Sequence, residues 1–435
     1  MTRAIVLLCL TQIVFLSPVR ADNWPEWRGP NRNGVSTESV PVRWSPTENV
    51  RWRLALPGPA GSTPAIWGDR IFLTSAAGDS LLALCASTAG KELWRREVGE
   101  GNKNVRGDEG NYASPSPVTD GKHVWVFMGN GLLACYSADG EPTWNLDLQE
   151  RYGKFEIQFG LSSTPILDGG RLYLQLIHGK WSRTPSRGLV VCLDAKTGDE
   201  VWKHVRETDA VDECKHSYAS PILYRDEDRS FLVSHGADWA IAHELDSGKE
   251  IWRCGDLNPK SNYNNTLRFV ASPAAVPGLI VVPTAKGGKV VAIRPGGKGD
   301  ITNTEDWIPW VLPRSTPDVP SPLIHDGIVY LCRENGVLIA LDAKSGEQIY
   351  EERTVRDRHR ASPVYAGGHV YLTARNGTIT VVKAGRDFEI VAQNSLGEPS
   401  SSSPAISGGV LYLRTFEALY AVADDEATDE TKKAD

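Results

Sequence analysis

The 435-residue chain lacks the short motifs that hold metals or reactive cysteine pairs. It contains no CxxC, no HExxH and no calcium-loop spacing, so no metal site is predicted. After residue 21, no apolar stretch is long enough to cross a membrane, so no transmembrane segment is predicted there. The sequence therefore directs attention to its repeats.

An excess of basic residues is also absent. The chain has 47 Lys and Arg against 54 Asp and Glu, a net charge of −7. Without residues 1–21, which contain Arg3 and Arg20, the difference becomes 45 − 54 = −9. A surface this acidic argues against nucleic acid as a partner.

A Ser-Pro or Thr-Pro pair opens a short apolar run eight times along the chain. The repeat prolines are Pro64, Pro117, Pro165, Pro221, Pro273, Pro322, Pro363 and Pro404. Spacings of 41 to 56 residues, with only strand-like segments between them, are typical of propeller blades. Proline suits the first residue of an inner edge strand, because no ladder hydrogen bond is lost there.

Each repeat predicts four antiparallel strands. Between Ala361 and Asn394, for example, Gly367-Gly368 and Asn376-Gly377 mark two tight hairpins. An aromatic residue recurs on the predicted outer strand, usually three or four residues after a glycine, and Ile390 takes this place in the seventh repeat. We expect these aromatic residues to pack between blades. They are Trp52, Trp94, Trp144, Trp202, Trp252, Trp310 (with Trp307 nearby) and Tyr350.

The count of strands predicts how the ring closes. Eight proline starts are followed by only seven outer strands, while residues 49–54 around Trp52 precede the first start. We therefore predict an all-β, eight-bladed propeller over residues 49–422, whose last blade is completed by the N-terminal strand.

The flanking segments have other predicted roles. Residues 1–21 resemble a signal peptide, with Arg3, an apolar run from Ala4 to Leu16 and a small-residue cleavage site. This predicts export to the periplasm or an equivalent envelope compartment. Residues 22–48 are expected to pack on the ring through Trp24 and Trp27, and the acidic tail 423–435 is expected to be disordered.

Six cysteines remain beyond the predicted signal peptide: Cys85, Cys135, Cys192, Cys214, Cys254 and Cys332. Their spacing is not that of a disulfide framework, although export would permit disulfides. Cys135 and Cys192 are expected at a repeat position that Ala83 and Ala340 hold in other blades, which favours small buried thiols.

The segments LDAKTGDEVW (residues 193–202) and LDAKSGEQIY (residues 341–350) resemble the PQQ-like propeller repeat. That repeat is shared by the quinoprotein alcohol dehydrogenases and the BamB family. WPEWRGPNRNG (residues 24–34) and EGNYASPSPVTDGKHVW (residues 109–125) resemble exported PQQ-like propellers of unassigned activity. In the first two segments, Asp194 and Asp342 are each expected to close a turn into the outer strand. Asp246 is expected to do the same in the fourth repeat.

The resemblance to quinoprotein dehydrogenases implies a site with adjacent cysteines, an acidic calcium ligand and a catalytic Asp. No two cysteines are adjacent here, so no catalytic residue is carried over and no cofactor or metal is predicted. The lipid-bearing cysteine of the BamB family is also missing.

The loops that enter each inner strand share one face with the loops between second and third strands, and we expect a binding surface there. This face also carries a long loop in the third blade, from His178 to Gly188. The candidate residues are Arg106, Asp108, Glu109, Tyr112, His178, Trp181, Arg183, His216, Tyr218, Asn264, Asn265, Arg268, Arg358 and Arg360. Ordinary solvated charge is the alternative interpretation.

These observations favour a monomeric, exported binding or scaffold propeller of the cell envelope without intrinsic catalysis. Its expected partner is an envelope protein or polypeptide, or an anionic envelope ligand. The alternative is a PQQ-dependent oxidoreductase with calcium and a divergent site.

Overall fold

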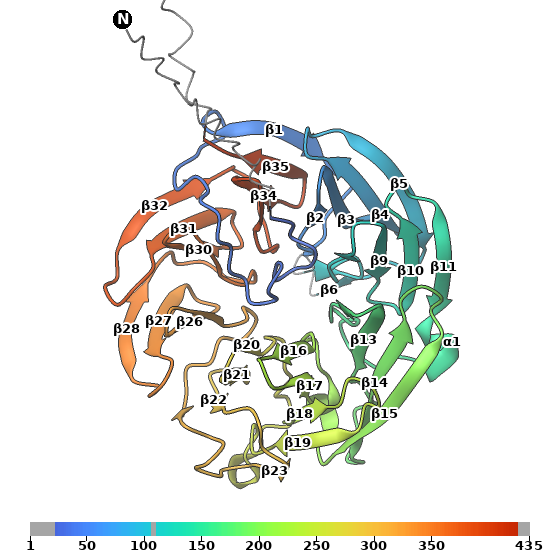
Figure 1. The fold of residues 1–435 in the computed structure, drawn as a ribbon, viewed down its shortest axis with the longest axis vertical. Helices are drawn as coiled ribbons and strands as arrows, with labels where there is room; N and C mark the ends of the chain where they lie inside the picture. Colours follow the sequence, from blue (N-terminus) through green and yellow to red (C-terminus); the bar gives the residue numbers. More distant parts are fainter. Residues whose placement is uncertain (1–21, 106–109, 425–435) are drawn as a thin grey trace, which may run out of the picture.

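The computed structural model describes residues 22–105 and 110–424, and the described chain forms a ring of eight β-sheets around a central axis (Figure 1). Seven sheets have four strands and the fourth blade has five. The predicted eight-bladed, all-β architecture is confirmed.

Blades 1 to 4 follow one another along the chain. Blade 1 contains β2 (Ala65–Trp67), β3 (Arg70–Ala77), β4 (Ser80–Ser87) and β5 (Glu92–Gly99). Blade 2 contains β8 (Val118–Thr119), β9 (His123–Phe127), β10 (Leu132–Ser137) and β11 (Pro142–Asp147). Blade 3 contains β12 (Ile166–Asp168), β13 (Arg171–Leu176), β14 (Ser186–Asp194) and β15 (Glu200–Thr208). Blade 4 contains β16 (Ile222–Arg225), β17 (Ser230–Gly236), β18 (Trp239–His243) and β19 (Glu250–Cys254), with β23 (Gly299–Asp300) added in parallel.

Blades 5 to 8 complete the circle. Blade 5 contains β20 (Ala274–Val276), β21 (Leu279–Pro283), β22 (Val290–Ile293) and β24 (Val311–Leu312). Blade 6 contains β25 (Leu323–His325), β26 (Ile328–Cys332), β27 (Val337–Asp342) and β28 (Gln348–Arg353). Blade 7 contains β29 (Val364–Ala366), β30 (His369–Thr373), β31 (Thr378–Lys383) and β32 (Ile390–Ser395). Blade 8 contains β33 (Ala405–Ser407), β34 (Val410–Arg414), β35 (Ala418–Val422) and β1 (Val50–Ala55).

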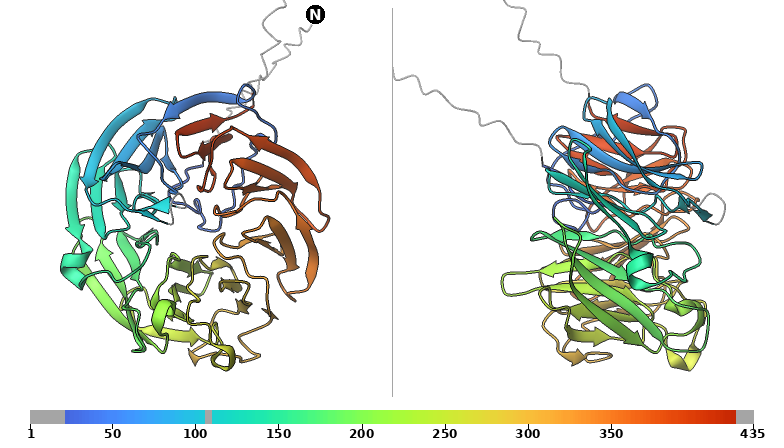
Figure 2. Two further views of the ribbon diagram at one scale, coloured as in Figure 1. Left: turned by 180° about the vertical axis from the view of Figure 1, so that it is seen from behind. Right: turned by 90° about the vertical axis from the view of Figure 1, so that its right-hand side faces the viewer.

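Several short elements lie in the loops that connect the strands of the blades. These are the hairpin of β6 (Asn104–Val105) and β7 (Gly110–Asn111), the helix α1 (Leu148–Tyr152), and the 3₁₀ turns η1 (Asp212–Lys215) and η2 (Lys260–Asn262). The β6–β7 hairpin projects from one side of the ring (Figure 2).

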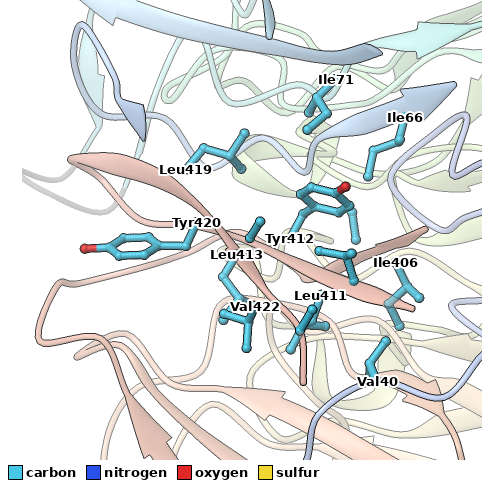
Figure 3. Packing of buried hydrophobic residues seen from close by; sticks show 14 of the residues in the cluster. Val40, Ile66, Ile71, Ile406, Leu411, Tyr412, Leu413, Leu419, Tyr420 and Val422 are labelled. Carbon is cyan, nitrogen blue, oxygen red and sulfur yellow. The ribbon is translucent and has the colours of Figure 1, made fainter. Parts of the chain in front are cut away.

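The ring closes as the strand count predicts. β1 pairs antiparallel with β35, and Trp52 lies opposite Ala421. The first strand of the ring and the last strands of the chain therefore share one sheet. Around this seam, side chains from blade 8, blade 1 and the N-terminal segment form a single apolar cluster (Figure 3).

The hydroxyl before each repeat proline explains why that position is Ser or Thr. In seven of the eight blades, from Thr63 in blade 1 to Ser362 in blade 7, the backbone N–H of this residue donates to the side-chain hydroxyl of the equivalent residue in the next blade. Seven such links, of 2.8 to 3.1 Å, connect Thr63, Ser116, Thr164, Ser220, Ser272, Ser321, Ser362 and Ser403 in order. Each hydroxyl satisfies a buried donor that the innermost strand cannot use in its own ladder.

The outer-strand tryptophans join blades in a second way. The indole N–H of Trp52, Trp94, Trp144, Trp202 and Trp310 donates to a backbone carbonyl of the next blade, at 2.8 to 3.1 Å. The recurrent glycine lies under this ring: a Cβ on Gly140 would come within 2.7 Å of the Trp94 ring. Trp52 and Trp144 are half-buried, whereas the other four tryptophans of the set and Tyr350 are buried.

Blade 7 departs from this pattern. Its outer position, opposite Val381, is Ala392, and Ile390 is 38% exposed, so the assignment of Ile390 to the docking position is wrong. Trp44 from the N-terminal segment fills the place instead. Its ring stacks on Tyr371 of β30 with 6.4 Å between centroids, and its backbone N–H donates to Asn394 Oδ1.

The segment before β1 crosses the face of the ring nearer the viewer in Figure 1. Trp24 exchanges two backbone hydrogen bonds with Ile66 of blade 1, and Val35 bridges to Tyr365 of blade 7. Arg28 donates to the carbonyls of Pro322 and Pro363. This segment therefore ties together blades that are far apart along the chain.

Two assignments within the repeat were wrong by a small register error. The residue opposite the docking Trp in blade 1 is Cys85, not Ala83, which lies opposite Arg96. Asp194 and Asp342 close their turns by accepting backbone N–H groups, as expected. Asp246, however, lies beyond the equivalent position and pairs with Arg171.

Candidate functional site at the mouth of the central channel

One residue from each blade lines the mouth of the central channel. All eight occupy the position two residues before the Ser or Thr of the repeat, where the chain enters the innermost strand. They are Gly61, Ser114, Ser162, Tyr218, Val270, Val319, Arg360 and Ser401. They enclose, with neighbouring loop residues, a pocket of about 220 Å³.

The lining is asymmetric around the ring. Blades 8, 1, 2 and 3 contribute Ser401, Gly61, Ser114 and Ser162, whose side chains are small or absent. Blades 4 to 7 contribute two valines and the larger Tyr218 and Arg360. The small residues leave room beside blades 8 to 3, facing the aromatic and cationic groups of the other half.

Arg268 is held on several sides by its surroundings. It is 9% exposed, and its Nη1 lies 3.3 Å from Glu213 Oε1. Its guanidinium carbon lies 5.6 Å from the centroid of the Phe159 ring, which in turn lies 5.9 Å from the Tyr218 ring. Cation–π and ionic contacts together hold this group in a partly dry environment.

Two further charged groups border the pocket. Arg360 Nη2 lies 3.0 Å from Glu334 Oε1, and Asp318 accepts the backbone N–H of Lys286. The mouth therefore presents arginines that are already matched by acids. An arginine in such a site can donate a hydrogen bond to a ligand anion, and its charge is still paired with an acid when the site is empty.

A buried lysine fixes the long loop of blade 3. The Lys215 ammonium donates to Lys180 O, Ser182 Oγ and Thr184 Oγ1, at 2.8 to 3.1 Å. His216 Nε2 donates to Gly179 O, which assigns the proton to Nε2. The loop ends earlier than expected, because Ser186 to Gly188 belong to β14 and pair with β15.

The structure brings together only part of the predicted surface. Tyr218, Arg268 and Arg360 line the mouth. Arg106, Asp108 and Glu109 lie outside the described residues. The assignment of the whole set to one binding surface stays a prediction.

The remaining candidates lie away from the pocket lining. Tyr112 packs against Gly129 and Gly160, and His178 lies against the Phe155 ring at 4.9 Å, where burial lowers the pKa of His178 to about 4. Arg183 pairs with Asp212, which also accepts from Asn265. The others are Trp181, which is 57% exposed, the buried His216, and the exposed Asn264 and Arg358.

Several lining residues were missed at the sequence level. Phe159, Asn111 and Asp318 were not singled out, and neither were the small residues of the mouth. The sequence could have predicted the small residues of the mouth, because the lining position has a fixed offset from the repeat proline. Phe159 and Asp318 come from loops that vary between blades, and no periodicity marks them.

A second polar cluster lies between the loops of blade 4. Tyr263 donates its hydroxyl to Asp238 Oδ2 at 2.7 Å, and Asn258 donates to the other carboxylate oxygen at 3.2 Å. Burial raises the pKa of Asp238 to about 6, against the opposing effect of these hydrogen bonds. Asp238 has a φ of +66°, a conformation that costs free energy for any non-glycine residue. The cluster holds the loop leading to Arg268.

The six described thiols of the ring are poorly suited to act as nucleophiles. All six described cysteines are free and buried. Burial raises the pKa of five of them to about 12 and that of Cys214 to about 11. A thiol is reactive as its thiolate, so these side chains act as packing groups.

The residues of the mouth do not fit a calcium-bound quinone. A hard cation such as calcium takes six to eight oxygen ligands, commonly carboxylates. Asp318 is the one carboxylate among the lining residues that the structure describes, and the described chain has no group of three or more His, Cys, Asp and Glu placed to hold a metal. No two cysteines are adjacent.

The eight blades, the tryptophan docking and the repeat define the chain as a PQQ-like β-propeller, as its sequence predicted. A family profile described as outer membrane protein assembly factor BamB matches residues 82–253, 182–305 and 302–423. These matches span most of the chain, which therefore belongs to the BamB family.

Relatives of this chain include both dehydrogenases and a BamB assembly factor. Polyvinylalcohol dehydrogenase from a Pseudomonas species is 24% identical over 200 residues, which cover 42% of this chain and 29% of that protein. BamB from Burkholderia pseudomallei is 23% identical over 214 residues, or 48% of each chain. The matched region spans less than half of each of these relatives.

Solved structures confirm the fold alone. BamB from Moraxella catarrhalis superposes with a TM-score of 0.62 at 13% identity, covering 86% of this chain and 99% of that one. A europium-containing methanol dehydrogenase gives 0.67 at 10% identity, covering 92% and 89%. Among the residues that the structure describes, no helix is long and apolar enough to cross a membrane.

Proposed function

We propose that this protein is an exported binding or scaffold propeller of the cell envelope, with no catalytic activity of its own. The ligand enters the mouth of the central channel and is an envelope polypeptide or an anionic envelope ligand. The proposal rests on the mouth of the channel, where small hydroxyl-bearing residues lie opposite Tyr218, Arg268 and Arg360.

The chemistry of this mouth suits recognition better than turnover. Arg268 offers a charge-assisted hydrogen bond to an anion, and Phe159 and Tyr218 offer aromatic surface beside it. A catalytic site would instead need a base and a nucleophile or cofactor within reach of each other. The similarity to a protein named for outer membrane protein assembly supports a binding role, and the likeness to polyvinylalcohol dehydrogenase supports the alternative.

A fluorescence-anisotropy titration tests the proposal. The probe is a labelled octapeptide rich in Asp, Glu and Phe with a free carboxyl terminus, and a Lys-rich peptide of the same length is the comparison. The wild type should bind the acidic peptide saturably and more tightly. Arg268→Ala should weaken that binding at least tenfold, about the value of one lost charge-assisted hydrogen bond.

The control is Arg386→Ala, because Arg386 is an exposed arginine that pairs with Asp342 on another part of the ring. This variant should bind like the wild type. Equal affinity of Arg268→Ala and the wild type, or no saturable binding of the acidic peptide, would contradict the proposal.

A further inference from the structure

Three arginines of the described residues are less than 5% exposed, but their guanidinium groups have different surroundings. Arg28, Arg206 and Arg414 are 4%, 1% and 2% exposed. Arg28 donates to three backbone carbonyls, those of Pro363, Asn33 and Pro322. Carbonyl dipoles on two sides thus replace the water that a buried cation loses.

Arg414 is not satisfied in this way. It ends β34 of blade 8 and reaches across the ring seam into blade 1. Its Nη1 donates to Ser62 Oγ and to the carbonyl of Thr74. Its Nε and Nη2 are buried and have no hydrogen-bond partner, and no carboxylate of the described residues lies within 4.0 Å of it.

The two unpaired nitrogens form one geometric unit. The N–H groups of Nε and Nη2 point in parallel from the same edge of the planar guanidinium, which is the fork that binds anions bidentately. Burial lowers the pKa of Arg414 to about 9, so the group still carries its charge at neutral pH. An unpaired buried charge of this kind is strongly unfavourable unless an anion accompanies it.

The seam lies next to the mouth of the central channel. Ser401, which precedes β33 of blade 8, has a buried Oγ without a hydrogen-bond partner. Gly61 and Ser401 line the mouth of the channel, next in sequence to Ser62 and Ser402, which themselves hydrogen-bond across the seam. The mouth and the seam are therefore neighbours, and the residues that line the mouth beside the seam have small or absent side chains.

We propose that the Nε–Nη2 fork of Arg414 binds one small monovalent anion of halide size, and that this anion completes the seam between blades 8 and 1. This site is separate from the proposed ligand contacts at Arg268. The bound anion supplies the counter-charge that no side chain provides, at the one place where the two ends of the ring meet.

Bromide substitution in crystals of the wild-type protein tests this directly. Anomalous diffraction at the bromine edge should show a peak beside Nε and Nη2 of Arg414 and none beside Arg28, whose donors are already used. Only water-like density, or no anomalous peak at Arg414, would overturn the proposal.

A solution measurement gives an independent readout. At constant ionic strength, with isethionate balancing chloride, the Tm of the wild type should rise with chloride and level off as the site saturates. Arg414→Gln should abolish this rise, whereas Arg28→Gln, which also removes a buried guanidinium, should keep it. A Tm of the wild type that does not change with chloride, or an unchanged chloride response in Arg414→Gln, would contradict it. If Arg414→Gln does not fold, the bromide map decides.

Discussion

At the scale of single residues, the repeat is explained by two kinds of contact between blades. Seven of the eight Ser or Thr residues before the repeat prolines accept a backbone N–H from the preceding blade, and five outer tryptophans donate to a carbonyl of the following one. Glycine is required under the tryptophan ring, because a Cβ there would overlap the indole. Each contact is modest, but both kinds recur in most blades, so their contributions to stability are distributed around the ring.

Glu26 makes the stability of the folded protein depend on pH. It is 6% exposed and accepts from Arg32 Nε at 3.1 Å, yet burial raises its pKa to about 7. The folded state therefore holds a proton that the unfolded state releases from about pH 4.5 upward, and stability falls as the pH rises toward 7. At about 1.4 kcal/mol per unit of pKa shift, this loss amounts to about 3 kcal/mol at most.

We therefore expect Glu26→Gln to become more stable relative to the wild type between pH 5 and pH 7. Urea denaturation midpoints of the two proteins at pH 5, 6, 7 and 8 measure this difference, and the other titrating groups cancel in the comparison. A stability difference that stays constant over this range would show that Glu26 keeps an ordinary pKa.

At the scale of elements, regular blades could be predicted from the sequence and irregular ones could not. Proline starts and hairpin glycines located the strands, since both residue types act through local backbone geometry. Blade 5 has an insertion that gives β23 to blade 4, and no local pattern predicts a pairing with another blade. The error at Ile390 has a similar cause, because the ring that fills that interface, Trp44, comes from the other end of the chain.

The same limits apply to the candidate site. Tyr218 and Arg360 occupy the lining position of the repeat, so a fixed offset from the proline could have found the eight residues, one from each blade, that line the mouth at this position. Arg268 and Phe159 lie on loops of irregular length, and only the three-dimensional structure brings them together. Periodic features of the mouth are thus predictable from sequence, and its specific chemistry is not.

Trp44 should contribute to the stability of the ring as much as the outer-strand tryptophans do. Truncation to Ala should lower the free energy of unfolding by about 3–5 kcal/mol, as for other large aromatic side chains in cores. Trp202→Ala should cost a similar amount, since its ring fills the equivalent gap between blades 3 and 4. Chemical denaturation measures both.

The control is Trp181→Ala, because Trp181 is 57% exposed and should change stability by less than about 0.5 kcal/mol. If Trp44→Ala were as stable as the wild type, the N-terminal segment would not substitute for the missing aromatic residue of blade 7.

At the scale of the whole molecule, the ring is closed by a strand and covered by a segment from the same end of the chain. β1 completes blade 8, and the segment before it crosses one face and contacts blades 1, 6 and 7. The channel mouth, with Arg268 and Tyr218, is formed by the loops that enter the inner strands. A rigid ring with one recessed, mixed-charge mouth is well suited to hold a ligand.

The central claim is that this member of the BamB family binds a ligand and does not oxidise alcohols with a quinone. Titration of the purified protein with PQQ in the presence of calcium, followed by gel filtration and a dye-linked assay with simple alcohols, aldoses and polyvinyl alcohol, tests this claim most directly. The account predicts that no cofactor elutes with the protein and that dye reduction stays at the level of protein-free controls. Uptake of one PQQ per chain, with turnover that disappears in Asp318→Asn, would contradict it.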